Sequence, residues 1–271
     1  MYLIWGSTYL GIFYAIQTVP PFLMAGARFF LAGLILYAVS RFRGTRPPTR
    51  AQWRNGALAG TLLLLGGNGL VTWAEQRVPS GVTALVVATS SVWMVLIAWA
   101  AGAGRPAGRA WAAIACALLG VALLVRSGVD PIGAAALVVS ALTWALGTIV
   151  ARRTDLPQST LLATAIEMLT GGAALIVAAI AVGEPMHLTH ISHTSLLAFL
   201  YLVTVGSLVG YSAYTYLVAN TTPARLGSYA YVTPVVAVTL GSTIAHEPLA
   251  PRTIVATIVI VLAVAILSFR R

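Results

Sequence analysis

Lysine is absent from this sequence, and acidic residues number only six. Charged residues of every kind make up 8% of the 271 residues, whereas hydrophobic residues make up 59%. A soluble domain of this length needs a far more charged surface, so the scarcity of charge excludes an ordinary water-soluble fold. Together with a mean hydropathy of +0.91, it indicates a protein embedded in a lipid bilayer.

Cysteine and nucleotide-binding motifs are scarce or absent as well. Cys116 is the single cysteine and stands in an apolar run, so it cannot form an internal disulfide, and we interpret it as a small buried hydrophobic residue. Without lysine there is no Gly-x-x-x-x-Gly-Lys loop, which excludes ATP hydrolysis by a site of that kind. We expect no cofactor.

The positive charge comes from arginine alone. The formal net charge is +10, and the arginines stand in short gaps between apolar runs. No basic face is large enough to contact several phosphates, so we expect no nucleic-acid partner. Arginines between apolar runs are typical of a protein anchored in a bilayer.

Ten apolar runs follow one another along the chain. A helix needs about 20 residues, at ~1.5 Å each, to cross ~30 Å of hydrocarbon. The connections are short and hold most of the proline and charge, which leaves no room for a soluble domain. We therefore predict an all-α integral membrane protein with ten transmembrane helices near residues 2–19, 22–40, 56–74, 80–102, 110–125, 132–151, 159–182, 194–218, 224–245 and 253–269.

The arginines divide unevenly between the two sides of the predicted membrane. Alternate connections and the C-terminal tail hold twelve of them, whereas the opposite connections hold only Arg77, Arg126 and Arg252. Cytoplasmic loops carry the excess of basic residues. We therefore expect a multi-pass protein of a bacterial inner (plasma) membrane with both termini in the cytoplasm.

A weak internal repeat relates the two halves. A shift of 139 residues places Trp5 on Trp144 and Arg28 on Glu167. Each half has five predicted helices, and an odd number of crossings forces the second half to enter the membrane from the opposite side. Inverted repeats of this kind are typical of secondary transporters, whose substrate site lies near the midplane. The predicted halves are residues 1–128 and 129–271.

The repeat also bears on the start of the chain. Trp144 lies about twelve residues into its predicted helix, by the spacing of these runs, whereas Trp5 lies only four residues after Met1. If the halves match, the first helix lacks a turn or two. We therefore expect this start to be late or truncated.

Several short motifs occur in order along nearly the whole chain. They are Trp5-Gly6-Ser7-Thr8-Tyr9-Leu10, Pro20-Pro21, Met24-Ala25-Gly26, Arg28-Phe29, Gly67-Asn68-Gly69, Ala74-Glu75, Val78-Pro79-Ser80-Gly81, Ala165-Ile166-Glu167-Met168-Leu169, Ser228-Tyr229-Ala230-Tyr231-Val232 and Pro234-Val235. With these motifs the sequence resembles the EamA-type permeases of the drug/metabolite transporter superfamily, and among them the YedA-like inner-membrane transporters. The resemblance implies a ten-helix exporter with a central cavity between its halves and with the fifth and tenth helices at the periphery. It leaves the substrate open, because such permeases carry amino acids, amines, sugar-related metabolites and drugs.

The sequence departs from the pattern of these permeases at two places. They usually have a proline in the fourth helix, where this chain has Ser90, and the equivalent position of the ninth helix is Pro234. They often have an acid after the fourth helix, where this chain has Ala103, and the equivalent position is Glu247. We therefore expect the proline kink and the acidic cap only in the second half.

Two charged residues lie deep within the predicted helices. Glu167 lies about nine residues into the seventh helix, near the midplane by a rise of ~1.5 Å per residue, and Arg28 is its repeat partner. A charge at this depth is costly, so it usually faces the protein interior or water. Glu167 is our candidate proton or cation site, and Arg28 is its counter-charge or a carboxylate anchor. The alternative is a structural ion pair between the halves, or a misjudged depth.

Polar and aromatic residues at similar depth are candidates for the lining of a substrate cavity. A glycine cluster around Asn68 weakens the helix there, and its amide suits an exposed backbone. Helix packing is the competing explanation for each serine and threonine, and core packing for each aromatic residue. Pro234 opens a backbone carbonyl. The candidates are Ser7, Thr8, Asn68, Ser90, Trp93, Trp144, Tyr229, Tyr231 and Pro234.

Three histidines recur in one connection, at His187, His190 and His193. Metal binding needs a fixed geometry and usually a further ligand, so we interpret them as part of a solvated loop and expect no metal site.

The sequence as a whole favours a secondary transporter. We expect it to export a small amphipathic metabolite, such as an amino acid, an amine or a drug, by alternating access. The alternatives are a channel or a receptor-like interaction protein. An intramembrane enzyme would need paired acids or a Ser/His dyad at one depth, and the sequence offers neither. The expected partners are a small-molecule substrate and the lipid bilayer; the oligomeric state stays open, and a monomer fits.

Overall fold

A computed structural model describes the chain from residue 1 to residue 271, except residues 103, 127, 187–189, 222–228, 249 and 269–271. Some residues of the predictions lie outside this described part, namely Ala103, His187, Arg225, Arg270 and Arg271. The described residues form helices joined by short connections. This agrees with the prediction of an all-α protein.

The helices follow the apolar runs closely. Three runs are interrupted within their length, so they consist of two or three consecutive segments, of which η1 and η2 are π-helical. The elements are α1 (Tyr2–Ala15), α2 (Pro21–Phe42), α3 (Arg50–Gly60), η1 (Thr61–Gly69), α4 (Leu70–Ala74), α5 (Ser80–Val87), α6 (Ser90–Ala100), α7 (Gly108–Arg126), α8 (Pro131–Arg153), α9 (Thr160–Ala181), α10 (His193–Tyr201), η2 (Leu202–Tyr211), α11 (Ser212–Asn220), α13 (Tyr229–Thr243) and α14 (Pro251–Ser268).

Among the described residues, seven helical runs are long and apolar enough to cross a membrane. Two shorter apolar helices, Ala230–Thr243 and Pro251–Ile266, add to them. The helix α1 ends at Ala15, four residues before the predicted end. The structure is thus an all-helical membrane protein, and the number of ten crossings stays a prediction.

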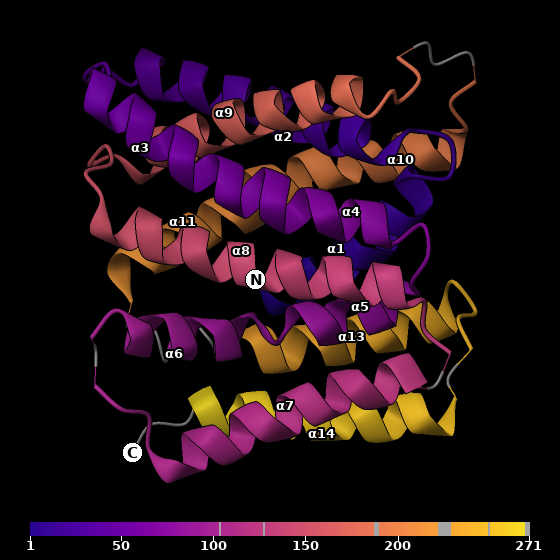
Figure 1. Cartoon of the computed structure of the whole chain (residues 1–271). Coiled ribbons are helices and arrows are strands. Elements are labelled where there is room, and N and C mark those ends of the chain that lie inside the picture. The colour runs from indigo at the N-terminus through magenta and orange to yellow at the C-terminus, as the bar shows by residue number, and fades with distance from the viewer. Residues whose placement is uncertain (103, 127, 187–189, 222–228, 249, 269–271) are drawn as a thin grey trace.

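The helices lie side by side, and their connections gather at two opposite ends of the molecule (Figure 1). The connections on the right of Figure 1 hold four of the six acidic residues, and we call this side the acidic end: Glu75, Asp130, Glu184 and Glu247. The connections on the left include those around Arg43, Arg105 and Arg152, and we call this side the arginine-rich end.

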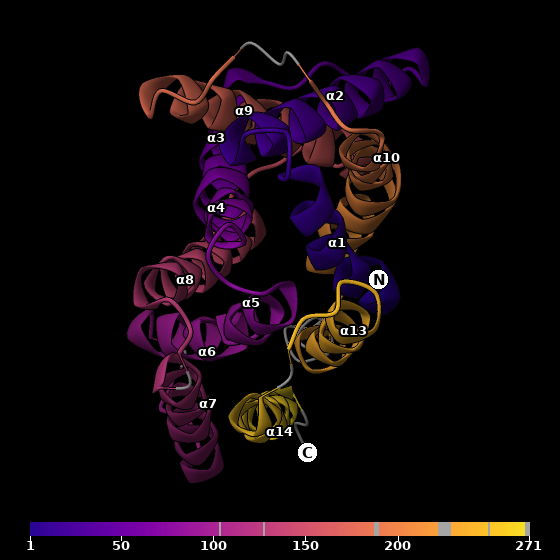
Figure 2. The same ribbon diagram turned by 90° about the vertical axis from the view of Figure 1, so that its right-hand side faces the viewer.

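Helices from the first and second halves of the chain alternate in space. The helix α2 packs along α9, α8 packs against η1, and α1 packs against α13 and α10. The helices α7 and α14 pack on each other at one edge of the molecule, where α14 also contacts α13 (Figure 2). Exchanging the two halves leaves the pairs α2 with α9 and α7 with α14 unchanged. The same exchange turns α1 with α13 into α8 with α6, and α8 with η1 into α1 with η2, which are also contacts in the structure.

Cys116 does not have the position that its apolar neighbours predicted. It lies in α7 and its side chain is exposed, whereas we expected a buried residue. The reason is that α7 lies at the edge of the molecule and buries only the face that packs against α14 and α6. An apolar surface of this kind suits contact with lipid.

The break in the fourth run falls where the sequence has no proline. The helix α5 ends at Val87 and α6 begins at Ser90, whereas α13 continues through Pro234. The hydroxyl of Thr89 donates to the Val86 carbonyl at 2.6 Å, and that of Ser91 donates to the Ala88 carbonyl at 3.3 Å. Hydroxyls that bond to nearby carbonyls compete with the helix backbone. The fourth run is therefore interrupted without a proline, which the sequence pattern did not predict.

Glycines allow α2 and α9 to approach each other closely. A Cβ atom at Gly172 would lie 2.6 Å from the backbone nitrogen of Phe30 and 3.1 Å from the carbonyl oxygen of Gly26. A Cβ atom at Gly26 would in turn lie 2.7 Å from Ile176. Small residues at such contacts are typical of helix pairs in membranes. This contact places Arg28, two residues after Gly26, in the middle of the molecule.

Replacing Gly172 should test this contact. We expect Gly172→Ala to lower the stability of the purified protein by roughly 1–3 kcal/mol, because the backbone of α2 must move to admit the methyl group. The measurement is thermal unfolding in detergent. Gly108→Ala is the control, because a Cβ atom there meets no atom within 4 Å. Equal melting temperatures for both variants would contradict the close contact.

Candidate functional site

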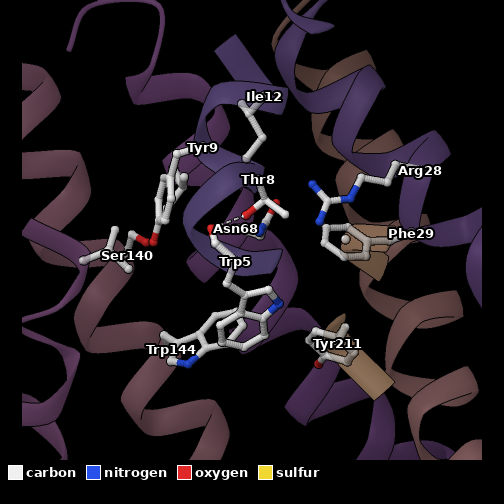
Figure 3. A pocket seen from close by; sticks show the side chains of 13 residues that line it. Trp5, Thr8, Tyr9, Ile12, Arg28, Phe29, Asn68, Ser140, Trp144 and Tyr211 are labelled. Carbon is white, nitrogen blue, oxygen red and sulfur yellow. Dashed lines mark hydrogen bonds between the residues drawn. The ribbon is translucent and has the colours of Figure 1, made fainter. Parts of the chain in front are cut away.

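A cavity lies between helices of the two halves of the chain. Its empty space, including the part open to solvent, is about 570 Å³. The elements α1, α2, η1, α4 and α5 line it from the first half, and α8 and η2 line it from the second half (Figure 3). The lining residues are Trp5, Thr8, Tyr9, Ile12, Arg28, Phe29, Asn68, Val71, Val87, Ser140, Trp144, Gly206 and Tyr211.

Arg28 is the charged residue in this lining. Its side chain is only 3% exposed, and its Nε donates to the Ser207 hydroxyl at 2.8 Å. The guanidinium carbon lies 4.4 Å from the centre of the Phe29 ring. Its Nη2 lies against Gly206, where a Cβ atom would be 3.4 Å away. The Nη1 atom is buried and has no hydrogen-bond partner.

Glu167 lies behind the cavity wall and does not form an ion pair with Arg28. The Tyr211 hydroxyl donates to Glu167 Oε2 at 3.0 Å, and Oε1 is buried without a hydrogen-bond partner. Tyr211 is a lining residue and Glu167 is not, so the carboxylate is linked to the cavity through Tyr211. The alternative from the sequence, in which Arg28 and Glu167 form a structural ion pair, therefore does not hold.

An aromatic cluster bounds the cavity on the side of the arginine-rich end. The rings of Trp5 and Trp144 meet edge to face at 5.6 Å, and Tyr214 lies 5.0 Å from Trp5 and 5.1 Å from Trp144. Tyr211 joins the cluster 6.3 Å from Trp144 (Figure 3). The hydroxyls of Tyr214 and Thr148 share a hydrogen bond of 2.5 Å. Rings at these spacings attract each other beyond simple burial.

The two π-helical segments reach the cavity from opposite halves. The segment η1 contributes Asn68 and η2 contributes Gly206. The Ser140 hydroxyl donates to the Gly67 carbonyl at 2.8 Å, and a Cβ atom at Gly67 would lie 2.8 Å from the Trp144 ring. Because π-turns widen the helix and free carbonyls, they occur often at functional sites. The glycines around Asn68 are therefore needed for close packing as well as for this geometry.

Carboxylates at the acidic end bind helix N-termini of the other half. Glu184 follows α9 and accepts from the backbone nitrogens of Phe22 and Leu23 at 3.0 and 2.8 Å. Glu247 follows α13 and accepts from the nitrogens of Ser80 and Gly81 at 2.7 and 3.1 Å. The first N–H groups of a helix lack partners and carry partial positive charge, so a carboxylate there is stabilising. These contacts join α9 to α2 and α13 to α5.

Glu75 lies near Glu247 at the same end, directly after α4. Its side chain is 5% exposed, and neither carboxylate oxygen has a hydrogen-bond partner. Burial, together with the charge of Glu247, raises the pKa of Glu75 well above its usual range. The charge of Arg28 acts on this pKa in the opposite direction, but burial has the larger effect, so the neutral form of Glu75 is favoured.

The predicted site residues divide into three groups. Arg28, Thr8, Asn68 and Trp144 line the cavity, and Glu167 contacts it through Tyr211. The side chain of Tyr229 lies outside the described residues. The remaining candidates are described but do not belong to the lining: Ser7, Ser90, Trp93, Tyr231 and Pro234.

Two of these candidates have clear roles in packing. Ser7 shares a hydrogen bond of 2.5 Å with the hydroxyl of Tyr201 and so joins α1 to α10. Ser90 is fully buried at the start of α6, next to the break in the fourth run. In both cases depth alone suggested a cavity residue, but the orientation of the helix turns the side chain elsewhere.

Several lining residues were not among the candidates, chiefly Trp5, Tyr9, Phe29, Ser140 and Tyr211. The repeat gave a usable signal for Trp5, because it is the counterpart of Trp144, and for Phe29, which follows Arg28. No such signal existed for Tyr211, because the eighth run holds four tyrosines and nothing in the sequence distinguishes Tyr211 among them.

Among the residues that the structure describes, no three His, Cys, Asp or Glu side chains are grouped as metal ligands. Two of the three histidines are described: His190 lies in the connection after α9, and His193 begins α10.

A cavity enclosed by apolar helices from both halves is a feature of membrane transporters, and the comparison with protein families agrees. A model described as the EamA-like transporter family matches residues 1–126 and 131–269. The chain therefore belongs to the EamA-like transporter family, and the protein is a membrane transporter.

The chain is also similar to individual proteins of known sequence. It is 40% identical over 272 residues to the inner membrane transporter YedA of Escherichia coli K12, covering 99% of this chain and 88% of YedA. The transporter YvbV of Bacillus subtilis is 21% identical, over 98% of this chain and 88% of YvbV. The chain is thus an EamA-type permease close to YedA. One solved crystal structure matches 98% of this chain and 93% of its own, with a TM-score of 0.70 and 21% identity, which shows the fold.

Removing the Tyr211 hydroxyl tests how much its hydrogen bond to Glu167 stabilises the protein. In Tyr211→Phe the carboxylate loses its hydrogen bond at Oε2, and both of its oxygens are then buried without a partner, so we expect the free energy of unfolding to fall by about 1–3 kcal/mol. In the Glu167→Gln background the same change should cost less, which a double-mutant cycle of melting curves measures. Tyr216→Phe is the control, since Tyr216 is exposed. Additive effects of the two changes would mean that the hydrogen bond contributes nothing.

Proposed function

We propose that the protein is a secondary transporter that exports a small amphipathic metabolite by alternating access, with the substrate bound in the cavity around Arg28. The observation that carries this proposal is the cavity itself, because both halves of the chain line it near the middle of the helices. Substrate sites of secondary transporters lie at such a repeat interface near the midplane.

The architecture of this transporter is proposed to be ten crossings in two inverted halves. Two observations support the repeat: the family matches residues 1–126 and 131–269, and the helix contacts correspond when the halves are exchanged. Trp5 and Trp144, which the repeat relates, also contact each other at 5.6 Å. Repeat-related residues meet in this way where a two-fold axis passes between them. We place the arginine-rich end in the cytoplasm on the excess of arginine.

The contacts at the acidic end are the proposed outer gate. Glu184 and Glu247 tie α2 and α5 of the first half to the ends of α9 and α13. The Ser195 hydroxyl adds a bond to the Tyr14 carbonyl at 2.8 Å, from α10 to α1. To open the cavity at this end, the halves must separate and these bonds must break. We therefore assign the structure to a conformation that is closed at the acidic end.

Transport in proteoliposomes tests the proposal directly. A carrier should show saturable uptake and counterflow, in which unlabelled solute on one side drives labelled solute from the other. A panel of amino acids, amines and organic acids, first screened by thermal shift of the purified protein, supplies the solutes. Ohmic current without saturation would instead indicate a channel, and the absence of any flux with every thermal-shift hit would contradict transport.

Neutralising Glu247 should open the proposed outer gate more often. In a Cys116→Ala background, we expect Thr8→Cys in the cavity to react faster with a membrane-impermeant maleimide from the acidic end when Glu247→Gln is added. The expected change is roughly tenfold, since ~1.4 kcal/mol shifts an equilibrium by that factor. Asp130→Asn is the control, because Asp130 accepts at 2.6 Å from Gly133 of its own helix. Equal labelling in both variants would exclude Glu247 from the gate.

A further inference from the structure

The lining of the cavity carries a positive charge and no negative one; Glu75, whose charge would attract Arg28, is buried outside the lining and has no hydrogen-bond partner. Among the thirteen lining residues Arg28 is charged and none is acidic. The deep acid, Glu167, bonds to Tyr211 behind the wall. Buried cations normally have a partner, because removing a charge from water is costly. Arg28 is 3% exposed and keeps a buried Nη1 without a hydrogen-bond partner, so this cation has an unused donor beside the cavity.

The other contacts of Arg28 fix the guanidinium in place. The Nε donates to Ser207, and the face of the group lies on the Phe29 ring. Gly206 leaves the space that Nη2 occupies, where a Cβ atom would be 3.4 Å away. A guanidinium held at Nε and at its face still presents its remaining N–H groups, which match the geometry of a carboxylate. In Figure 3 the group points across the cavity toward Thr8.

The remainder of the lining suits an apolar or aromatic body. Trp5, Trp144, Phe29 and Tyr211 present rings, and Ile12 is one of three aliphatic side chains beside them. One guanidinium balances one carboxylate, whereas a doubly charged phosphate would keep a buried charge without a partner. An amine without a carboxylate would place a second positive charge beside Arg28, with no acidic lining residue to offset it.

We infer that the substrate is a small carboxylate with an apolar or aromatic side chain, either a free acid or an amino acid, and that Arg28 binds its carboxylate. This inference rests on the proposed transport function and narrows its substrates. Amines and cationic drugs without a carboxylate are excluded. The ammonium group of an amino acid is accommodated by the rings of the aromatic cluster, whose faces attract cations.

Matched ligand sets test the inference. Purified protein in nanodiscs is titrated calorimetrically with phenylalanine and leucine, with the deaminated acids hydrocinnamate and isocaproate, and with the decarboxylated amines phenethylamine and isoamylamine. Members of each set share a side chain and differ only in charged groups. We expect the carboxylates to bind and each amine to bind at least about tenfold more weakly than its matched acid.

Variants of Arg28 provide the second test of the inference. Arg28→Gln should weaken carboxylate binding at least about tenfold, and Arg28→Lys should retain part of it, because a point charge replaces the planar group. Arg77→Gln is the control, since Arg77 is exposed at the acidic end and stacks on Trp73 at 5.0 Å, away from the cavity. Melting temperatures of all variants are recorded alongside. The ligand comparison on the unaltered protein decides the question if Arg28→Gln does not fold.

The outcomes separate this inference from the proposed function. An amine that binds as tightly as its matched acid overturns the carboxylate assignment, and so does a folded Arg28→Gln protein with unaltered affinity. If amines bind and also show counterflow, the transport function stands and only the substrate class is wrong. If no member of the sets binds or shows counterflow, the carboxylate inference fails, and the transport proposal then depends on the wider panel alone.

Discussion

The hydrocarbon of a bilayer offers no hydrogen bonds, so every backbone N–H and C=O within it must find a partner in the protein. This constraint explains why the described chain is helical throughout its apolar runs. It also explains where the helices are irregular. The segments η1 and η2 and the break before Ser90 lie in runs packed against other helices rather than in the edge pair α7 and α14. The Gly67 carbonyl of η1 accepts from the Leu70 backbone nitrogen and also from the Ser140 hydroxyl of the neighbouring helix α8.

The same constraint governs where charge occurs. Glu184 and Glu247 receive two backbone N–H groups each at helix N-termini, and those groups would otherwise lack partners. Glycines shape one of these sites, because a Cβ atom at Gly241 would lie 2.5 Å from Glu247. At the centre, Glu167 accepts a hydrogen bond from the Tyr211 phenol. Arg28 donates to the Ser207 hydroxyl and lies against the Phe29 ring. The repeat-related charges are thus held separately rather than by each other.

The sequence predicted the fold class and the position of most helices, because long apolar runs leave few alternatives to a membrane helix. It also indicated part of the site: Arg28 through its depth, Trp144 through the repeat and Asn68 through its glycines. Depth along a helix says nothing about rotation around its axis. Ser90 and Trp93, chosen by depth, therefore do not belong to the lining of this cavity, and Tyr211 was missed because nothing in the sequence distinguishes it from the other tyrosines of its run.

Contacts between distant segments could not be predicted from the sequence, for a different reason. The bonds from Glu247 to Ser80 and Gly81 span more than 160 residues, and nothing local to either segment indicates the other. The break in the fourth run arises from Thr89 and Ser91, whose hydroxyls also occur in regular membrane helices. Whether such a hydroxyl bends a helix depends on the packing around it, which a single sequence does not record.

The hydrogen bonds between the halves at the acidic end have a kinetic consequence for a carrier of the proposed kind. Bonds from Glu184, Glu247 and Ser195 join the halves at the acidic end, and they lower the free energy of one resting conformation relative to the other. Such a bias cancels around a closed cycle, so it cannot accumulate solute against a gradient. It does make the half-saturation concentrations on the two membrane faces unequal, and the maximal rates of inward and outward flux then differ by the same ratio.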